Sequence, residues 1–437
     1  MISGLILVLG YFVIVVSPLL ILLKLHVGTP NETIYEIARS LALSGFAILA
    51  LQPVLVARLK WIERPFGMDI VSRFHKSMGV FATLLLISHP PLLVLGGGGL
   101  PLILSLDQPY YIWFGKIGIS LLVIHTILSV FSPNLGLKFE QWRRIHYILA
   151  PFIIILVFVH SFETGDDLKL LPVQLLWVIL LIVALAAYSY HKILKPAFLA
   201  REPYRVADVQ QETHNVWTVK LVPPEGKPIY DYFPGQFQFI TFQRDRDLPV
   251  EEHHWTISSS PTQKAFVTST IKESGDFTST IGLTKPGDTA IVQAPFGRFS
   301  HVFHPEDKDI VFLAGGIGIT PFMSMLRYMR DTKSERNVIL LYGNKYEADI
   351  VFRNELAEME ASHNPHLRVI HVLSNPESDW PGERGHVDRE KLERLVGSIT
   401  TRTFYVCGPP AMRIKLIDTL RSIGVPYERI RTEIFAL

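Results

Sequence analysis

Four histidines in the apolar first half of the chain have a spacing that suits iron binding. His75 and His89 are 14 residues apart, and so are His146 and His160. On a helix this spacing is about 3.9 turns, so both members of a pair point to nearly the same face, about 21 Å apart along the axis. Two opposed imidazoles at one depth are good ligands for a six-coordinate haem iron. The pattern predicts two stacked haems, held by His75 with His146 and by His89 with His160. Four separate, hydrogen-bonded histidines are the alternative.

Six apolar stretches have to position these histidines. Each is long enough, or nearly so, to cross a hydrocarbon core of about 30 Å as a helix. They lie near Ile2–Leu23, Ile34–Ala57, Phe74–Leu95, Tyr111–Phe131, Ile145–Phe162 and Leu170–Tyr190. The histidine pairs fall on the third and fifth stretches. Ionisable residues inside a span are expensive, so Arg39 is predicted to contact an outer-haem propionate or the electron acceptor, with snorkelling to the interface as the alternative. His125 has no partner at matching spacing and is expected to be packed.

The charge distribution separates this apolar region from the rest. The chain has 437 residues with a net charge of +2, and only 23 of its 82 charged residues lie in residues 1–200. The single cysteine excludes an internal disulfide, and no basic stripe indicates a nucleic-acid partner. Basic residues concentrate in the loops 58–76 and 138–144 and in the segment 192–205. By the positive-inside rule these face the cytoplasm, as do the N-terminus and the charged second half. We therefore expect an integral protein of the plasma or inner membrane.

The charged second half divides into two patterns. Short alternating strands between turn signals predict a small antiparallel β-barrel over residues 201–305. These strands are expected at Tyr204–Gln210, Val216–Val222, Phe237–Phe242, Phe266–Lys272 and Thr289–Gln293. From residue 306 to 437, strands alternate with helices, which predicts an open parallel α/β sheet. The predicted fold is therefore multi-domain: a six-helix transmembrane bundle (1–200), then the antiparallel barrel, then the parallel α/β domain.

Two loops at the ends of predicted strands favour dinucleotide binding. The first carries Gly315, Gly316 and Gly318, followed by Thr320 and Pro321. Such glycines let backbone N–H groups approach a pyrophosphate at a helix N-terminus, with Thr320 as the cap and Pro321 in the first turn. An ordinary tight turn is the alternative.

The second loop, Cys407-Gly408-Pro409, is expected on the same sheet edge, near the nicotinamide. For Cys407 a buried inert thiol is the alternative. Lys345 follows the second strand of the α/β domain, where it allows a ribose 2′-phosphate, although a solvated lysine fits equally.

Further motifs complete a family pattern. His253-His254-Trp255-Thr256-Ile257-Ser258-Ser259 is similar to a His-Pro-Phe-Thr-Ile/Leu-Ser/Thr-Ser flavin motif, from which it departs at His254 and Trp255. Phe233–Phe237, Gly275-Asp276-Phe277-Thr278 and Pro295–Gly297 look like signatures of ferredoxin–NADP reductase-type domains. The tail Glu433-Ile434-Phe435 is similar to a C-terminal Glu-x-Phe. With the histidine helices, these motifs resemble the NADPH oxidase and ferric reductase superfamily of transmembrane flavocytochromes b, over almost the whole chain.

The resemblance implies cofactors and site residues. It implies FAD in the barrel domain, two b-type haems on the four histidines, and NADPH or NADH in the α/β domain. Phe435 would cover the flavin ring, and Cys407 and Arg39 would lie at the two ends of the electron path. The implied FAD and nucleotide ligands are His253, Trp255, Thr256, Ile257, Ser258, Ser259, Lys272, Gly275, Phe277, Thr278, Gly315, Gly316, Gly318, Thr320, Pro321, Lys345, Gly408 and Pro409.

The implied activity is electron transfer across the membrane. Cytoplasmic NAD(P)H would supply electrons that pass through FAD and the haems to a small-molecule acceptor outside. The short outer loops favour O2, which would give superoxide, and a ferric-chelate reductase with the same path is the alternative. A non-enzymatic haem sensor is a third hypothesis, against which the nucleotide-binding pattern argues.

Overall fold

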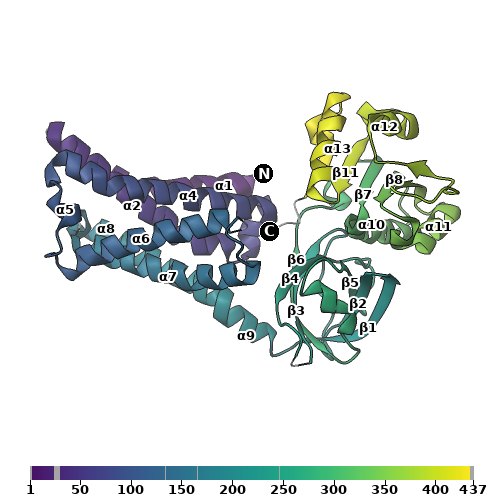
Figure 1. The fold of residues 1–437 in the computed structure, drawn as a ribbon, viewed down its shortest axis with the longest axis horizontal. Helices are drawn as coiled ribbons and strands as arrows, with labels where there is room; N and C mark the ends of the chain where they lie inside the picture. The colour runs from purple at the N-terminus through teal and green to yellow at the C-terminus, as the bar shows by residue number, and fades with distance from the viewer. Residues whose placement is uncertain (1, 24–29, 133, 165, 246, 434–437) are drawn as a thin grey trace. The chain divides into compact units, whose positions relative to one another are not determined.

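The computed structural model describes residues 2–23, 30–132, 134–164, 166–245 and 247–433. The chain forms two compact units, Met1–Lys195 and Pro196–Leu437 (Figure 1). The first unit is helical, and the second contains two β-sheets with helices.

Six helices of the first unit are long and apolar enough to span a membrane, which confirms the number expected from the sequence. They are α1 (Ile2–Leu23), α2 (Pro30–Val56), α4 (Met68–Leu93), α6 (Tyr110–Phe131), α7 (Phe139–Thr164) and α8 (Leu171–Ser189). Shorter helical segments are α3 (Lys60–Phe66), η1 (Val94–Gly98), α5 (Pro101–Leu104), η2 (Asp166–Lys169), η3 (Tyr190–Leu194) and α9 (Lys195–Leu199). Helices α4 and α7 begin six residues before the predicted stretches, because polar first turns extend each apolar run.

Helix α2 is the core of the helical unit. It packs against α1, α4, α7 and α8. Small residues on α2 allow this close approach: Ala47 is fully buried, and a Cβ at Gly45 would lie 2.8 Å from the Leu86 side chain of α4. Phe46 stacks on Trp177 of α8 at 4.9 Å between ring centroids. The histidine-bearing helices α4 and α7 are therefore both held against α2, and both also pack against α6.

The first sheet of the second unit is antiparallel, with strand order β4-β3-β6-β1-β2-β5. Its strands are β1 (Tyr204–Thr213), β2 (Val216–Val222), β3 (Phe237–Gln243), β4 (Glu252–Thr256), β5 (Val267–Lys272) and β6 (Thr289–Phe296). The sequence predicted a barrel. Among the described residues the two edges are joined by the bridge between Ile257 and Ser269 and by the bond from Ser258 N to Thr268 O, without a continuous closing ladder. Strand β4 was not anticipated.

The second sheet is parallel, with strand order β10-β9-β8-β7-β11-β12, as the alternation of strands and helices predicted. Its strands are β7 (Asp309–Gly315), β8 (Asn337–Asn344), β9 (His366–Leu373), β10 (Glu383–Arg384), β11 (Thr403–Cys407) and β12 (Ile430–Thr432). Its helices are α10 (Thr320–Asp331), α11 (Arg353–Ser362), α12 (Arg389–Val396) and α13 (Pro410–Ser422).

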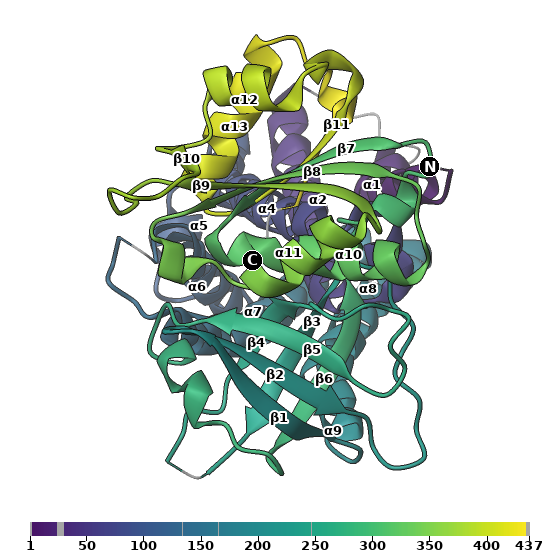
Figure 2. The ribbon, with the colours of Figure 1, turned by 90° about the vertical axis from the view of Figure 1, so that its right-hand side faces the viewer.

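Helices cover both faces of this sheet. Figure 2 shows α10 and α11 on one face and α12 and α13 on the other. Along β7, Ile310 and Phe312 belong to the core under α10 and α11, whereas Val311 and Leu313 belong to the core under α12 and α13. This alternation follows from the two-residue period of a strand.

Candidate functional site

One predicted histidine pair is held by main-chain carbonyls. His89 Nδ1 lies 3.0 Å from the carbonyl oxygen of Ala38 on α2, and His160 Nδ1 lies 2.9 Å from that of Tyr111 on α6. A carbonyl oxygen only accepts, so each Nδ1 carries the proton and donates it. The neutral ring then presents an unprotonated Nε2, which is the metal-binding form of histidine. Both side chains fit the role of iron ligand.

Gly115 leaves the space that His160 occupies. A Cβ at this position of α6 would lie 2.6 Å from the imidazole ring of His160. Real Cβ atoms do not tolerate such a contact, so glycine is required for this ring position. Gly115 could not be predicted from the sequence, because only the packing of α6 on α7 shows why this position needs a glycine.

The other predicted pair comes together directly. The ring centroids of His75 on α4 and His146 on α7 are 6.2 Å apart. Two imidazoles on opposite sides of one metal, with metal–nitrogen bonds of about 2 Å each, have centroids about 6 Å apart. The spacing of this pair therefore fits one iron between the rings.

Three further side chains surround His146. His125 of α6 stacks on it, with ring centroids 4.5 Å apart, and Trp142 lies at 5.3 Å. Ser129 Oγ is 3.4 Å from His146 Nδ1 and accepts a hydrogen bond from Trp142 Nε1 at 3.4 Å. His125 is packed, as expected, but it packs on a predicted ligand. The sequence did contain a signal for this contact: His125 and Ser129 are spaced i,i+4, which places both side chains on the same face of a helix.

Arg39 is engaged within its own helix. Its Nη1 lies 3.0 Å from Glu36 Oε1, and its guanidinium lies 5.9 Å from the Tyr35 ring centroid. Arg39 follows Ala38, whose carbonyl holds His89. Its contact with a propionate or an acceptor stays a prediction.

In the second unit, the predicted flavin motif lies on β4 and the residues after it. β4 pairs with β3, so Trp255 is opposite Gln238, and Ile257 N donates to Gln236 O at 2.9 Å. The Phe233–Phe237 and His253–Ser259 motifs are therefore neighbours. His253 lies 4.3 Å from Phe277 between ring centroids, and Trp255 stacks on the same ring at 6.0 Å.

The hydroxyl groups of the flavin motif differ in their exposure. Ser258 Oγ is buried and bonded to Thr268 and Thr270 at 2.9 and 3.0 Å. Ser259 Oγ is buried against Tyr232 Oη at 3.0 Å. Both hydroxyls are bonded within the protein, whereas Thr256 is half-buried. The flavin contacts of all three residues stay predictions.

The other predicted flavin residues lie at the ends of elements. Lys272 ends β5, and Gly275 leads into the short helix η4 (Thr278–Leu283). Thr278 Oγ1 accepts a hydrogen bond from Ser274 N at 2.7 Å. Glu433 Oε1 accepts one from Arg298 N at 3.2 Å, so the tail returns to the 295–297 segment. Phe435 lies outside the described residues.

The two predicted nucleotide loops contact each other, because β7 and β11 are adjacent parallel strands. A Cβ at Gly318 would lie 2.5 Å from Cys407 O, and one at Gly408 would lie 3.1 Å from Gly315 Cα. Gly316 has a positive φ of 52°, with nothing within 4 Å of its Cβ position. The space over this loop is open, which fits the approach of a phosphate group.

The start of α10 differs from the expectation. The helix begins at Thr320 itself, and no side chain caps it. Thr320 Oγ1 instead donates to Ile317 O at 3.0 Å, so the predicted N-cap is wrong. Pro321 lies in the first turn, as expected. The short helix η6 (Gly316–Ile319) leads directly into α10, and Thr320 N donates to Ile317 O.

The remaining predicted residues have distinct environments. Cys407 is buried at the end of β11, and burial raises the pKa of its thiol, which is therefore protonated. Pro409 packs beside Gly315. Lys345 is exposed directly after β8, with its Nζ 5.0 Å from the Tyr346 ring centroid.

Two family models match the regions of the chain that contain these residues. Residues 41–157 match the family "Ferric reductase like transmembrane component", and residues 312–416 match "Oxidoreductase NAD-binding domain". The chain therefore combines a ferric reductase-like transmembrane region with an oxidoreductase NAD-binding region. This confirms the resemblance stated from the motifs, including an FAD- and NAD(P)H-binding reductase region.

Individual relatives match the second half of the chain. The gamma subunit of sulfhydrogenase 1 from Pyrococcus furiosus is 27% identical over 221 residues, which is 50% of this chain and 73% of that protein. The ferredoxin reductase component of a 3-ketosteroid-9-alpha-monooxygenase from Mycolicibacterium smegmatis is 31% identical over 238 residues, 53% of this chain and 64% of that protein.

A solved structure shares the fold. It is a flavohemoglobin from Malassezia yamatoensis with bound FAD and heme, with a TM-score of 0.50 and 17% identity over 94% of this chain and 99% of that one.

Proposed function

We propose that this protein carries electrons from NAD(P)H on the cytoplasmic side to an acceptor on the outer side, with FAD and two b-type haems as cofactors. The observation that carries the proposal is the anchoring of His89 and His160 by carbonyls of two other helices. This anchoring presents two Nε2 atoms inside a region that matches a ferric reductase-type family.

Each cofactor has a separate chemical purpose. Bound FAD accepts electrons in pairs and releases them singly, and bound haem iron carries single electrons. The chain's own residues hold and orient these groups. His75 and His146 would hold one iron, and His89 and His160 would hold the other. Trp255 and Thr256 would contact the flavin, and the loops around Gly316 and Gly408 would hold the dinucleotide. None of these residues has to act as an acid or base.

We further propose O2 as the acceptor, with superoxide as the product, and a ferric chelate as the second candidate. The family match to a ferric reductase component favours the second candidate. The short outer segment 96–110, which contains α5, favours the first.

The test uses purified full-length protein loaded with FAD and haem. A dithionite-reduced b-type spectrum and haem reduction by NAD(P)H are expected. Superoxide dismutase should then abolish NAD(P)H-dependent cytochrome c reduction. Ferric-chelate reduction that persists without oxygen, together with cytochrome c reduction insensitive to the dismutase, would replace O2 by the ferric acceptor. A protein without a b-type spectrum would overturn the proposal.

A further inference from the structure

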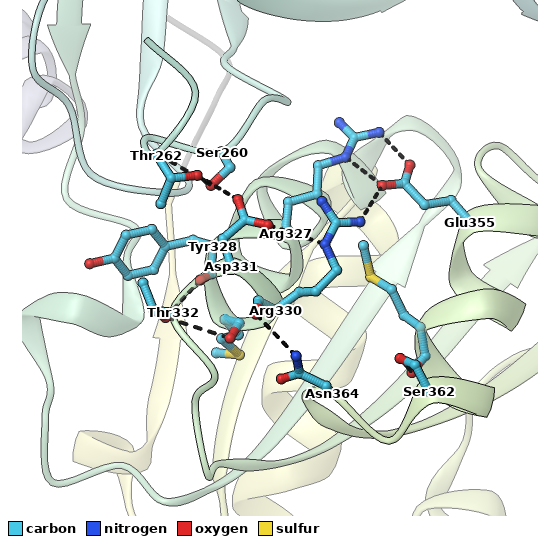
Figure 3. Close-up of polar contacts among 12 residues, drawn as sticks. Ser260, Thr262, Arg327, Tyr328, Arg330, Asp331, Thr332, Glu355, Ser362 and Asn364 are labelled. Atoms are coloured by element: carbon cyan, nitrogen blue, oxygen red, sulfur yellow. Dashed lines mark hydrogen bonds and ion pairs between the residues drawn. The ribbon is translucent and has the colours of Figure 1, made fainter.

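One face of α10 carries three polar side chains that contact the end of the flavin motif. Ser324, Arg327 and Asp331 are spaced i, i+3 and i+7, so they lie along one side of the helix. The segment they contact, Ser258–Thr262, begins two residues after the end of β4. Figure 3 shows the outer part of this contact, where Thr262 meets Asp331 and Arg327 meets Glu355.

The contacts fix two consecutive carbonyl groups. Arg327 Nη1 donates to Ser258 O at 2.6 Å, and Ser324 Oγ donates to Ser259 O at 2.7 Å. Thr262 Oγ1 donates to Asp331 Oδ2 at 2.5 Å. The main chain of the flavin motif is thus bonded at adjacent positions to the helix that begins after the glycine loop.

Arg327 is itself held in place by α11. Its Nε and Nη2 donate to the two carboxylate oxygens of Glu355 at 2.9 and 2.5 Å, a paired geometry that orients the guanidinium. Burial raises the pKa of Glu355, but the hydrogen bond and charge of Arg327 outweigh it, so the pKa is lowered overall and the carboxylate stays charged. The remaining Nη1 points to Ser258 O in a fixed direction.

We propose that Arg327 is a positioning residue that sets the distance between the flavin and nicotinamide sites. The inference rests on the proposed function, in which one hydride, with both its electrons, passes from NAD(P)H to FAD. Because α10 begins at the glycine loop, a shift of Ser258 relative to Arg327 changes the separation of the two binding segments. A misplacement of about 1 Å can cost about a hundredfold in rate.

The experiment compares Arg327→Met and Arg327→Lys in full-length protein. The dissociation constant of FAD and the visible circular dichroism of bound FAD are measured without NAD(P)H. Anaerobic stopped-flow reduction then gives the limiting rate and the half-saturating NADPH concentration. We expect the methionine variant to lower the limiting rate by about 10- to 100-fold and to change the dichroism, with FAD affinity kept. Lysine, whose ammonium still donates to Ser258 O, should restore part of the rate.

Arg330→Met is the matched control. Arg330 lies on the same helix and contacts Asp331 and Glu355, at 3.2 and 3.5 Å, without a bond to the flavin motif. The limiting rate of flavin reduction in Arg330→Met should stay within about twofold of wild type. Equal losses in both variants, a wild-type rate in Arg327→Met, or a loss explained by FAD release would overturn the inference. If the flavin of the wild-type protein is not reduced by NAD(P)H, the proposed function fails. The circular dichroism of FAD bound to Arg327→Met then tests the inference separately. A spectrum equal to that of wild type overturns the positioning of the flavin by Arg327, and a changed spectrum supports it.

Discussion

Two histidines of the helical unit and one histidine of the second unit differ in what holds the imidazole ring. In the helical unit, His89 and His160 each donate Nδ1–H to a carbonyl oxygen of another helix. In the second unit, His301 is 1% exposed, and within the described part of the chain its Nδ1 has no hydrogen-bond partner. Burial and the nearby charge of Arg336 lower the pKa of His301 to about 3.

The difference teaches that burial alone does not identify a metal ligand. A histidine anchored through Nδ1 has a fixed ring and a defined tautomer, and its Nε2 is directed to a partner. His301 is neutral because protonation would place a charge in an apolar site beside an arginine. Histidines anchored through Nδ1 should therefore respond to changes in iron binding, whereas His301 should respond to pH.

The largest expected effect is the loss of one haem in His160→Ala. Removal of one iron ligand should lower the reduced-minus-oxidised haem absorbance per protein by about half, because the His75–His146 site is separate. Flavin reduction by NAD(P)H should continue. His301→Phe, which removes a buried histidine of the other type, should keep the full absorbance. An undiminished haem spectrum in His160→Ala would refute the assignment.

The next effect is steric. Gly115→Ala would place a Cβ 2.6 Å from the His160 ring, so the ring must turn away from its carbonyl partner. Loss of such orientation typically costs about 10- to 100-fold in metal affinity, measurable by haem titration of the apoprotein. Gly10→Ala on α1 is the control, because nothing lies within 4 Å of its Cβ position. Similar haem affinities for the two variants would show that His160 does not need this space.

His301 should make stability depend on pH. Its folded pKa of about 3 lies below its unfolded value, so below about pH 6.5 the unfolded chain binds the extra proton. The contribution of His301 to the free energy of unfolding is therefore fully present above about pH 6.5. Below that pH, the free energy of unfolding decreases by about 1.4 kcal/mol per pH unit as the pH falls towards 3. His301→Phe should flatten urea-unfolding midpoints measured from pH 7 to pH 5. His386→Phe, at an exposed histidine, should leave the slope unchanged. A slope that persists in His301→Phe contradicts this origin.

The smallest effect is expected at the pair His75 and His146, where His146 is held mainly by ring stacking. Ser129→Ala removes a contact of 3.4 Å to His146, while the stacking of His125 remains. We expect less than about a tenfold change in haem affinity, below the usual range for such partners, because the bond is long. Ser120→Ala on the same helix, where the hydroxyl bonds to Lys116 O, is the control. A larger loss of haem affinity in Ser129→Ala than in Gly115→Ala would contradict the expectation that the His89–His160 pair is the more sensitive of the two.

The sequence was sufficient to predict those parts of the site that depend only on the regular geometry of helices and sheets. Equal spacing on two helices predicted that His75 and His146 meet, and the carboxyl-end rule predicted that the loops at Gly315 and Gly408 lie together. Both predictions need only the rise of a helix or the order of strands in a sheet.

What could not be predicted depends on contacts between distant segments. β4 has the sequence Glu-His-His-Trp-Thr, without apolar alternation, and it is a strand because it pairs with β3. The bond from Arg327 to Ser258 joins residues 69 positions apart. The cap expected at Thr320 failed because the short helix η6 (Gly316–Ile319) precedes it, so Thr320 has helical backbone angles and cannot be an N-cap.

The alternation along β7 has a further consequence for how the nucleotide-binding region opens. Since neighbouring residues of this strand belong to the cores on opposite faces, neither helical layer can detach without exposing one side of β7 to water. The strand is also paired on both edges, with β8 and β11. Its amide hydrogens should therefore exchange with solvent only through global unfolding of this region, whereas those of the edge strand β10 should exchange through local fraying.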